Sequence, residues 1–579
     1  MTGRQRWITA VILLVVGTAA PLITQRDHGV VRDEVVYMNA GTAYARWWGD
    51  LFRGKGAATT EQITAHFGGK QVTDHNSEHP PLMKTLFGIS EAVVSRLGGG
   101  QQHKVTAYRI PTALFFGLLL VMVFLFGASV WGWTEGVLAA LLLLLMPRLL
   151  FHAGLATFDA PMVTVWTAAL LAYYKSLERP WLWGALFGVA FGLALATKHN
   201  AVILPAAILV HWSWVLVRET RSRRAADTEL GLGTALWRAL LRRGPLTVPA
   251  MVVIGPLVLV ALWPWLWFDT AHHVSRWIGF HLHHVDYNFE YLGQNWNHPP
   301  FPWHVAIVTT LFTVPTVTLV AGAIGAVQLI ARARAGIASQ PERAPALLLF
   351  LSAGVAMGPF LLRTTPIFGA SKHWLPAMPT ITLYAGVGLV VAVRLAVDRL
   401  ARVGLLKRVE RARPIAIAAV AVLVCTASAF ETVDAQPYAL THYTALAGGA
   451  PGGADLGMNR QFWGYSAVGV LPFLDRVAAH SDEPLPVYSH DASMAWGVWM
   501  REGLLSRKLP DAGHEESGVR RSKLAIVIHE LHFNRHDYMI WRDYGTVQPV
   551  YVLTTDGVPI VSVYARRGVI SSTATRHPR

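Results

Sequence analysis

The stretch YRIPTALFFGLLLVMVFLFGASV, from Tyr108 to Val130, carries a single charged side chain, that of Arg109. A helix needs about 20 predominantly apolar residues to cross the hydrocarbon core of a bilayer, so this stretch is long enough for one membrane span. Similar runs recur along the first three quarters of the chain. They predict eleven spans, with approximate cores at residues 7–24, 108–130, 135–150, 158–175, 181–197, 200–217, 246–267, 303–331, 345–362, 374–394 and 414–431.

The composition also indicates a membrane protein. Of the 579 residues, 53% are hydrophobic and 15% are charged, whereas a soluble protein usually has about 25% charged residues. The chain therefore lacks the polar surface that a water-exposed globule needs. Its one cysteine, Cys425, lies within an apolar run, so no internal disulfide can form.

The positive charge is distributed as an orientation signal. A formal net charge of +15 is compatible with a nucleic-acid partner. However, arginines concentrate in the connections 218–243 and 394–413, whereas the connection 268–302 has more Asp and Glu than Arg and Lys. Because cytoplasmic loops are enriched in Lys and Arg, this pattern places the N-terminus in the cytoplasm. We therefore interpret the charge as topology rather than as nucleic-acid binding.

The predicted fold is a mainly α, polytopic membrane protein of about eleven transmembrane helices in two parts. Residues 1–431 form the transmembrane module, with a large first extracytoplasmic loop at 25–107 and a second at 268–302. Residues 432–579 form a small extracytoplasmic α/β domain. The runs KLAIVIH and QPVYVL in that domain read as buried strands.

The first span has a second interpretation. Arg4 and Arg6 precede the apolar run and small residues follow it, as in a secretory signal peptide. An uncleaved first helix nevertheless gives a consistent topology for everything downstream, and we prefer it.

Two adjacent carboxylates, Asp33 and Glu34, follow the first span directly. Taken alone, they can simply cap a helix and complement its dipole. Their position close to the outer membrane surface also makes them candidates for acid–base chemistry.

Further ionisable residues lie at the same predicted face. Each lysine or arginine alone can extend to the lipid headgroups, whereas an acid at the boundary of a span is costly and is a functional candidate. Their convergence on one face favours a shared site. The candidates are Glu78, His79 and Lys84 around a Pro-Pro turn, Arg109, Asp159, Lys198, His199, Lys372 and His373.

The 268–302 loop is rich in histidine. The spacing of His281, His283 and His284 admits a metal site. No cysteine or carboxylate pattern of a known zinc site accompanies it, so we predict no resident metal or other cofactor and keep a divalent cation as the alternative.

In this order the motifs resemble the protein O-mannosyltransferase-like family (glycosyltransferase family 39, within the GT-C superfamily), whose relatives include the bacterial transferases that add aminoarabinose to lipid A. The resemblance extends to about residue 470. It rests on Asp33-Glu34, the HPPL of His79 to Leu82, Asp159-x-Pro161, Lys198 after a Gly/Ala-rich span, Tyr291 to Gln294, Pro299 to Trp303, Gly448-Gly449 with Gly453-Ala454, and Phe462 to Gly464.

The resemblance implies a GT-C fold whose module 1–431 is catalytic. Such an enzyme moves a sugar from a polyprenyl-phosphate donor to an acceptor hydroxyl on a protein, lipid or glycan, with inversion. Asp33 would be the general base, and Glu34 would assist or only orient the loop. Donor-phosphate ligands would be Lys198, Arg109, Lys372, His79 and Lys84; sugar or acceptor ligands would be Asp159, Glu78, His199 and His373.

Two other functions remain open at this point. A lipid or sugar transporter would place charges near the midplane and break its helices in paired positions. A scaffold would use its exported tail to bind a partner. The compact loops and the lack of disulfides favour a bacterial inner membrane, with the site and the C-terminal domain facing outward.

Overall fold

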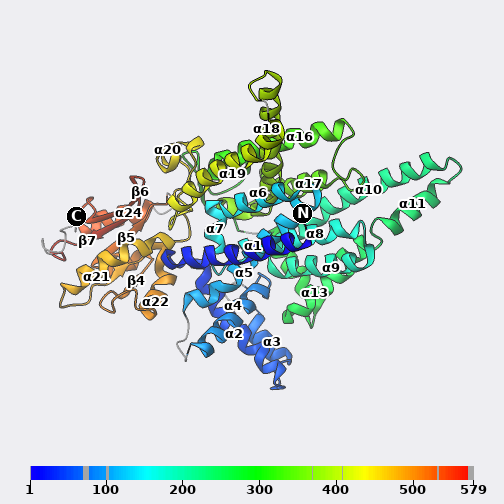
Figure 1. The fold of residues 1–579 in the computed structure, drawn as a ribbon. Helices are drawn as coiled ribbons and strands as arrows, with labels where there is room; N and C mark the ends of the chain where they lie inside the picture. The colour runs from blue at the N-terminus through cyan, green and yellow to red at the C-terminus, as the bar shows by residue number, and fades with distance from the viewer. Residues whose placement is uncertain are drawn as a thin grey trace.

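The computed structural model of the chain describes residues 2–68, 77–98, 104–283, 285–367, 369–406, 408–530 and 534–570. These residues form a mainly helical molecule with a five-stranded sheet near the C-terminus and a two-stranded ribbon in the middle of the chain. Figure 1 shows the sheet and its helices gathered at one end, with α10 and α11 at the opposite end.

Seven helical segments of the described chain are long and apolar enough to cross a membrane. They are built from α1 (Gly3–Thr24), α5 (Val105–Val130), α9 (Pro180–Thr197), α10 (Leu204–Ala226), α16 (Thr316–Arg334), α18 (Met378–Arg402) and α19 (Val409–Asp434). Two further candidates are bent pairs: α6 (Trp133–Leu144) with α7 (Pro147–Ala153), bent by 74°, and α11 (Leu232–Arg242) with the segment Thr247–Leu262, bent by 52°. That segment contains α12 (Thr247–Pro249) and α13 (Gly255–Leu262).

The multi-pass helical class is confirmed, but the number eleven is not. Each predicted span coincides with helix, yet 158–175 and 345–362 correspond to α8 (Asp159–Ser176) and α17 (Pro345–Met357), which are not among the candidate spans. Helix α17 is only 13 residues long, and α8 is buried along most of its length inside the bundle.

The predicted span 303–331 is also divided. Helix α15 (Val305–Thr313) ends before Pro315, and α16 begins after it. Proline disfavours helical geometry in the residue before it and cannot donate its own N–H, so a break at this position follows from local chemistry.

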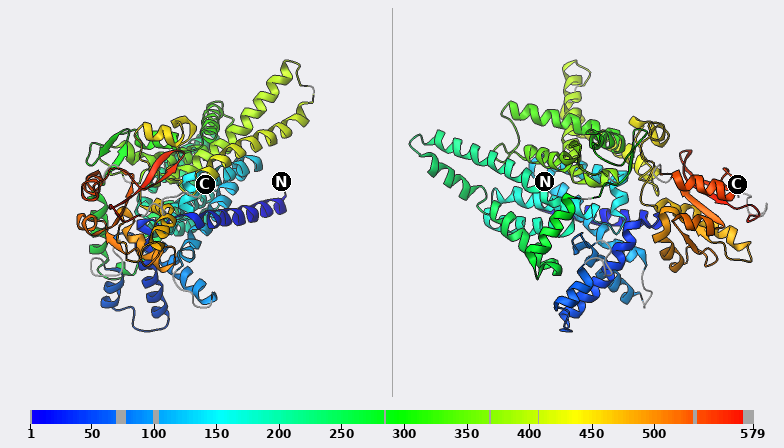
Figure 2. Two further views of the ribbon diagram at one scale, coloured as in Figure 1. Left: turned by 90° about the vertical axis from the view of Figure 1, so that its left-hand side faces the viewer. Right: turned by 180° about the vertical axis from the view of Figure 1, so that it is seen from behind.

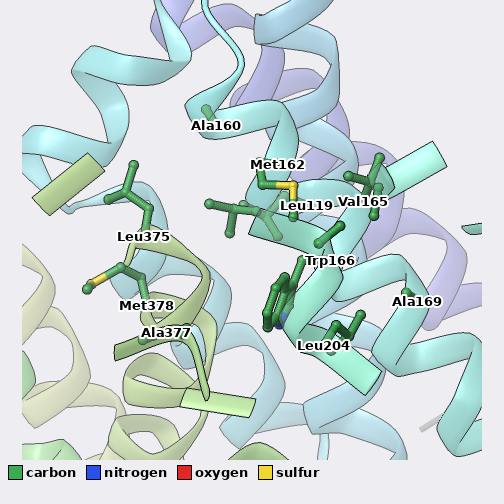
Figure 3. Close-up of a cluster of buried hydrophobic side chains, with 14 of the residues drawn as sticks. Leu119, Ala160, Met162, Val165, Trp166, Ala169, Leu204, Leu375, Ala377 and Met378 are labelled. Atoms are coloured by element: carbon green, nitrogen blue, oxygen red, sulfur yellow. The ribbon is translucent and has the colours of Figure 1, made fainter. Parts of the chain in front are cut away.

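The interior of the bundle is closely packed around α8. Trp166 of α8 belongs to the same buried cluster as Leu119 of α5 and Met378 of α18 (Figure 3). The indole N–H of Trp166 donates to Ser352 Oγ of α17 at 2.9 Å. A buried tryptophan is thus both packed and hydrogen-bonded, as such a side chain requires.

The described part of the loop after α1 contains the helices α2 (Arg32–Phe52), α3 (Thr60–Phe67) and α4 (Leu82–Leu97). Helices α2 and α4 touch through glycines, since a Cβ added to Gly88 would lie 1.9 Å from the carbonyl oxygen of Gly41. This close approach holds the middle of α2 against the middle of α4. The loop 268–302 contains α14 (Thr270–Leu282) and a ribbon of β1 (Phe289–Tyr291) and β2 (Gln294–Trp296).

The C-terminal region has the strand order β4-β3-β5-β7-β6. Strand β3 is parallel to its neighbours β4 and β5, whereas β7 is antiparallel to β5 and β6. The strands are β3 (Val487–Tyr488), β4 (Asp511–Gly513), β5 (Leu524–Ile528), β6 (Tyr551–Thr555) and β7 (Val558–Ala565); the helices are α20 (Gly449–Asp455), α21 (Leu471–Ala479), α22 (Ser493–Arg501), α23 (Glu516–Arg521) and α24 (Asn534–Tyr544).

The strand predicted within 523–529 is confirmed as the fully buried β5. The strand predicted at 548–553 begins later, as β6. Its side chains alternate between half-buried and exposed, because Tyr551 and Leu553 on one face pack against the buried cluster and the other face is open.

The hydrophobic core of the sheet continues into the first loop. Ile526 and Trp496 belong to the same buried cluster as Met38 of α2, Phe87 of α4 and Phe158 just before α8. The C-terminal region is therefore packed directly onto the elements that carry the acidic motif. By contrast, the arginine-rich turn between α18 and α19 projects away from the body (Figure 2, left).

Candidate functional site

A cavity of about 250 Å³ lies where the first loop, one end of the helix bundle and the C-terminal sheet meet. Its lining combines charged, imidazole and aromatic groups, including Arg32, Asp33, Tyr37, Glu78, His79, Phe158, Asp159, Lys198, His199, Tyr287, Lys372, His373, Phe462, Trp463, Asp491 and Glu530. Eight of the eleven predicted site residues are in this lining. The other three, Glu34, Lys84 and Arg109, are not.

Asp33 lies in the first turn of α2 and is accessible from the cavity, with 27% of its side chain exposed. Trp463 donates its indole N–H to Asp33 Oδ2 at 3.1 Å. Lys372 Nζ lies 4.0 Å from the same oxygen, and Arg32 Nε lies 3.8 Å from Oδ1. The carboxylate is thus oriented by one hydrogen bond and flanked by two cations.

Glu34, the next residue, points away from the cavity and is fully buried. Both its oxygens accept from Arg109, at 2.8 Å from Nε and 2.7 Å from Nη2. The backbone N–H of Ala156 donates to Glu34 Oε1 at 2.7 Å, and Arg109 also donates to the carbonyl of Gly29 at 2.8 Å. This bidentate pair ties α2 to α5 and to the segment before α8, so its geometry is that of a structural link.

Asp159 and Lys198 form a second buried pair, this one at the cavity wall. Lys198 Nζ lies 2.7 Å from Asp159 Oδ1, and His152 Nδ1 lies 3.6 Å from Oδ2. Asp159 begins α8, where the helix dipole favours an anion. Lys198 follows the last residue of α9. The pair therefore fixes the ends of two helices and presents a cation to the cavity.

Lys372 lies in a short turn before α18 and is 7% exposed. Its ammonium sits 4.2 Å from the centroid of the Trp463 ring, in a cation–π arrangement. Burial lowers the pKa of Lys372 to about 8, an effect that Asp33 and Asp159 oppose and that Lys198 and Arg32 reinforce. Its contact with Asp33 is longer than the contact of Lys198 with Asp159, so an incoming phosphate oxygen competes with a weaker pair here.

The segment before α4 contributes Glu78 and His79 to the lining. Burial lowers the pKa of His79 well below its ordinary value, with His199 as the next cause, so His79 is neutral at neutral pH. Its ring stacks near His199, with centroids 5.6 Å apart. Lys84 is completely buried in α4 and donates to the carbonyl of His79 at 3.4 Å. It therefore stabilises the backbone of this segment.

The possible metal site in the histidine-rich loop gains no support within the described ranges. The His281 ring is stacked on His199, with centroids 3.8 Å apart. His284 lies outside the described residues. Among the residues that are described, no group of three or more His, Cys, Asp or Glu side chains is arranged to hold a metal ion.

Two acids that the sequence motifs did not indicate, Asp491 and Glu530, complete the lining. Asp491 follows β3, and Glu530 follows β5. Because β3 and β5 are parallel neighbours, their carboxyl ends meet at one edge of the sheet, where α/β sheets commonly bind ligands. Of these two strands, only β5 was predicted, so the position of this sheet edge could not be located from the sequence.

The comparison with protein families agrees with the motifs. Residues 78–242 match the model of the family "Dolichyl-phosphate-mannose-protein mannosyltransferase". The match confirms the family resemblance over that region, which contains the predicted residues from Glu78 to His199. Asp33, Glu34, Lys372 and His373 lie outside it. No curated protein sequence matches the chain.

Solved structures of similar fold include ArnT from Cupriavidus metallidurans in the apo state, with a TM-score of 0.48, 14% identity and coverage of 100% of each chain. The ArnT structure bound to undecaprenyl phosphate gives a TM-score of 0.47, 14% identity and 99% of each chain. The archaeal oligosaccharyltransferase AglB from Archaeoglobus fulgidus, in complex with an inhibitory peptide and a dolichol-phosphate, gives 0.47 and 10% identity, over 94% of this chain and 71% of that one.

Proposed function

We propose that this chain is a membrane glycosyltransferase that moves a sugar from a polyprenyl-phosphate donor to an acceptor hydroxyl on a protein, lipid or glycan. The proposal rests on one observation above the others: a single cavity brings the accessible carboxylate of Asp33 within 4.0 Å of Lys372, with Lys198 in the same lining. An anionic leaving group and a hydroxyl that must lose a proton need this combination of groups.

The proposed reaction is one displacement at the anomeric carbon. The acceptor oxygen attacks from the face opposite the phosphate and forms the new glycosidic bond. The bond between the anomeric carbon and the phosphate oxygen breaks, and its electron pair leaves with polyprenyl phosphate. Asp33 takes the hydroxyl proton, and the configuration inverts. Trp463 orients the base through its 3.1 Å hydrogen bond.

Lys372 is the principal phosphate ligand in this scheme, with Lys198 as the second. Fixed cations in the cavity stabilise the negative charge that develops on the leaving phosphate. Asp159 acts through Lys198, whose ammonium it holds at 2.7 Å. We assign Glu34 and Arg109 to the structural link between α2 and α5, and Lys84 to support of the His79 segment.

The remaining lining residues form the walls for the sugar and the acceptor. Glu78, His199 and His373 lie in the lining and present hydrogen-bonding groups to hydroxyls. Neutral His79 stacks against His199 and supports this wall. No step in the scheme requires a metal ion or another cofactor.

We further propose that residues 1–431 are the catalytic membrane module, that residues 432–579 are an extracytoplasmic domain, and that both the cavity and this domain face outward from a bacterial inner membrane. The arginine-rich turn 394–413 supports this orientation, because it projects from the body away from the C-terminal sheet (Figure 2, left).

The test is the release of polyprenyl phosphate. Purified protein in detergent is incubated with a panel of polyprenyl-phosphate sugars and with crude membrane extract as the source of acceptor. We expect release by the wild type from one donor and none by Asp33→Asn, which keeps the size of the side chain but cannot accept the proton. If no donor is consumed with extract present, the transporter function becomes the better explanation.

A further inference from the structure

The C-terminal region contributes an ion pair directly at the proposed catalytic base. Arg32 Nη1 donates to Asp491 Oδ1 at 3.1 Å, whereas Arg32 Nε lies 3.8 Å from Asp33 Oδ1. The guanidinium is therefore bonded to the acid of the C-terminal region and only adjacent to Asp33. Asp491 is the more buried partner, with 10% of its side chain exposed against 45% for Arg32.

This arrangement matters because a base needs a lone pair that can be reached. A guanidinium that turned onto Asp33 would form a charge-assisted bond, which is roughly twice as strong as a neutral one. It would occupy the oxygen that must accept the proton and would make the carboxylate less basic. Asp33 Oδ2 already accepts one hydrogen bond, from Trp463, so a guanidinium on Oδ1 would place a donor on each oxygen and lower the basicity of the carboxylate further.

The position of Asp491 is fixed by the backbone around it. A Cβ added to Gly464 would lie 2.6 Å from the carbonyl oxygen of Asp491, so the two segments are in direct contact. Gly464 follows Trp463, whose carbonyl accepts from the backbone N–H of Arg32 at 3.2 Å. Arg32, Trp463 and Asp491 thus form one closed set of contacts around the base.

The second acid, Glu530, also lies near the Arg32 guanidinium. Burial, with neighbouring Asp491 as the next cause, raises the pKa of Glu530 well above its usual range, and Arg32 works against that shift. Burial also raises the pKa of Asp491, but the adjacent guanidinium of Arg32 works against that shift. Of these two acids, Asp491 is the one that accepts a hydrogen bond from Arg32, at 3.1 Å.

We propose that Asp491 is a positioning residue of the active site: it holds the Arg32 guanidinium away from Asp33 and so keeps that carboxylate able to accept the acceptor proton. The C-terminal region then completes the active site as well as covering it. This inference rests on the proposed transferase function and on Asp33 as its base.

The test is a double-mutant cycle on purified full-length protein, with release of polyprenyl phosphate as the assay. In Asp491→Asn the guanidinium loses its anion and turns to Asp33. We expect kcat to fall about ten- to a hundredfold, part of the effect of a general base, with the donor KM changed less than about threefold because the phosphate cations are untouched. Asp491→Glu should retain most of the rate. Asp482→Asn, an exposed acid of the same region, is the matched control and should behave as the wild type.

The second single variant of the cycle is Arg32→Gln, and the comparison that decides is the effect of Asp491→Asn with and without it. Without a guanidinium to restrain, Asp491→Asn should cause no further loss of kcat in the Arg32→Gln background, whatever the kcat of Arg32→Gln itself, a clear departure from additivity. Additive losses in the double variant would overturn the inference. If Asp491→Asn does not fold, Asp491→Ser takes its place in the cycle, with the same two outcomes. A wild type that releases nothing would instead refute the transferase function itself.

Discussion

Lys372 gives the proposed donor site a pH dependence that can be measured. Burial lowers the pKa of this lysine to about 8, so its ammonium is charged below that pH and loses its proton as the pH rises through it. The charged fraction is therefore about one half at pH 8 and about one tenth at pH 9. A hydrogen bond to a charged group contributes about 1.5–3 kcal/mol, so the neutral form should bind the donor phosphate at least about tenfold more weakly.

The expected result is a donor KM that rises with pH on the alkaline side of pH 8. Between pH 8 and 9 the donor KM should rise about three- to fivefold, while the donor, a phosphate diester, does not titrate. The measurement is the initial rate of polyprenyl phosphate release as a function of donor concentration, at half-unit pH intervals from 6.5 to 9.5.

Lys372→Arg is the matched variant, because a guanidinium stays protonated throughout this range. Its donor KM should be flat where that of the wild type rises, even if its kcat is lower from the larger side chain. Identical alkaline limbs in the two proteins would refute the assignment of Lys372 as the titrating phosphate ligand.

Two further predictions concern stability. Glu34→Gln leaves the buried Arg109 guanidinium without its carboxylate and should lower the free energy of unfolding by about 3–5 kcal/mol, read as a lower thermal transition in detergent; an unchanged transition would contradict the structural role of this pair. Gly88→Val places a side chain where a Cβ lies 1.9 Å from the Gly41 carbonyl oxygen. The substitution should lower the free energy of unfolding by at least about 1–3 kcal/mol, because the added side chain forces α2 and α4 apart. An unchanged thermal transition with full activity would show that the two helices tolerate this separation.

The fold was predictable where apolar length alone decides it. Long runs such as 108–130 became helices of the expected extent, here α5. The span predicted at 158–175 forms α8, which is not among the candidate spans: its ends carry Asp159 and Lys175, and most of its residues are buried inside the bundle. The prediction also missed the break at Pro315, since hydropathy averages over a single proline. The short β3 has two residues, too few for a periodic pattern to be detected.

The site was predictable to the extent that its residues follow span ends in sequence. The predicted topology places the span ends next to these residues on one face of the membrane. In the structure one cavity is lined by Asp33, Asp159, Lys198 and Lys372. Glu34 differs from Asp33 only by direction: neighbouring residues on a helix point about 100° apart, and one carboxylate faces the cavity while the other faces α5. No sequence pattern distinguishes these two directions without the packing of α5 and α8.

The buried cluster that joins Ile526 and Trp496 to Met38 and Phe87 constrains how this protein can change over evolution. A substitution on the sheet face that alters side-chain volume must be matched on α2 or α4, and those helices position Asp33 and the His79 segment. Divergence of the C-terminal region is therefore transmitted to the catalytic groups. A chimaera that exchanges the last 150 or so residues between relatives should regain activity only if the facing residues of α2 and α4 are exchanged with them.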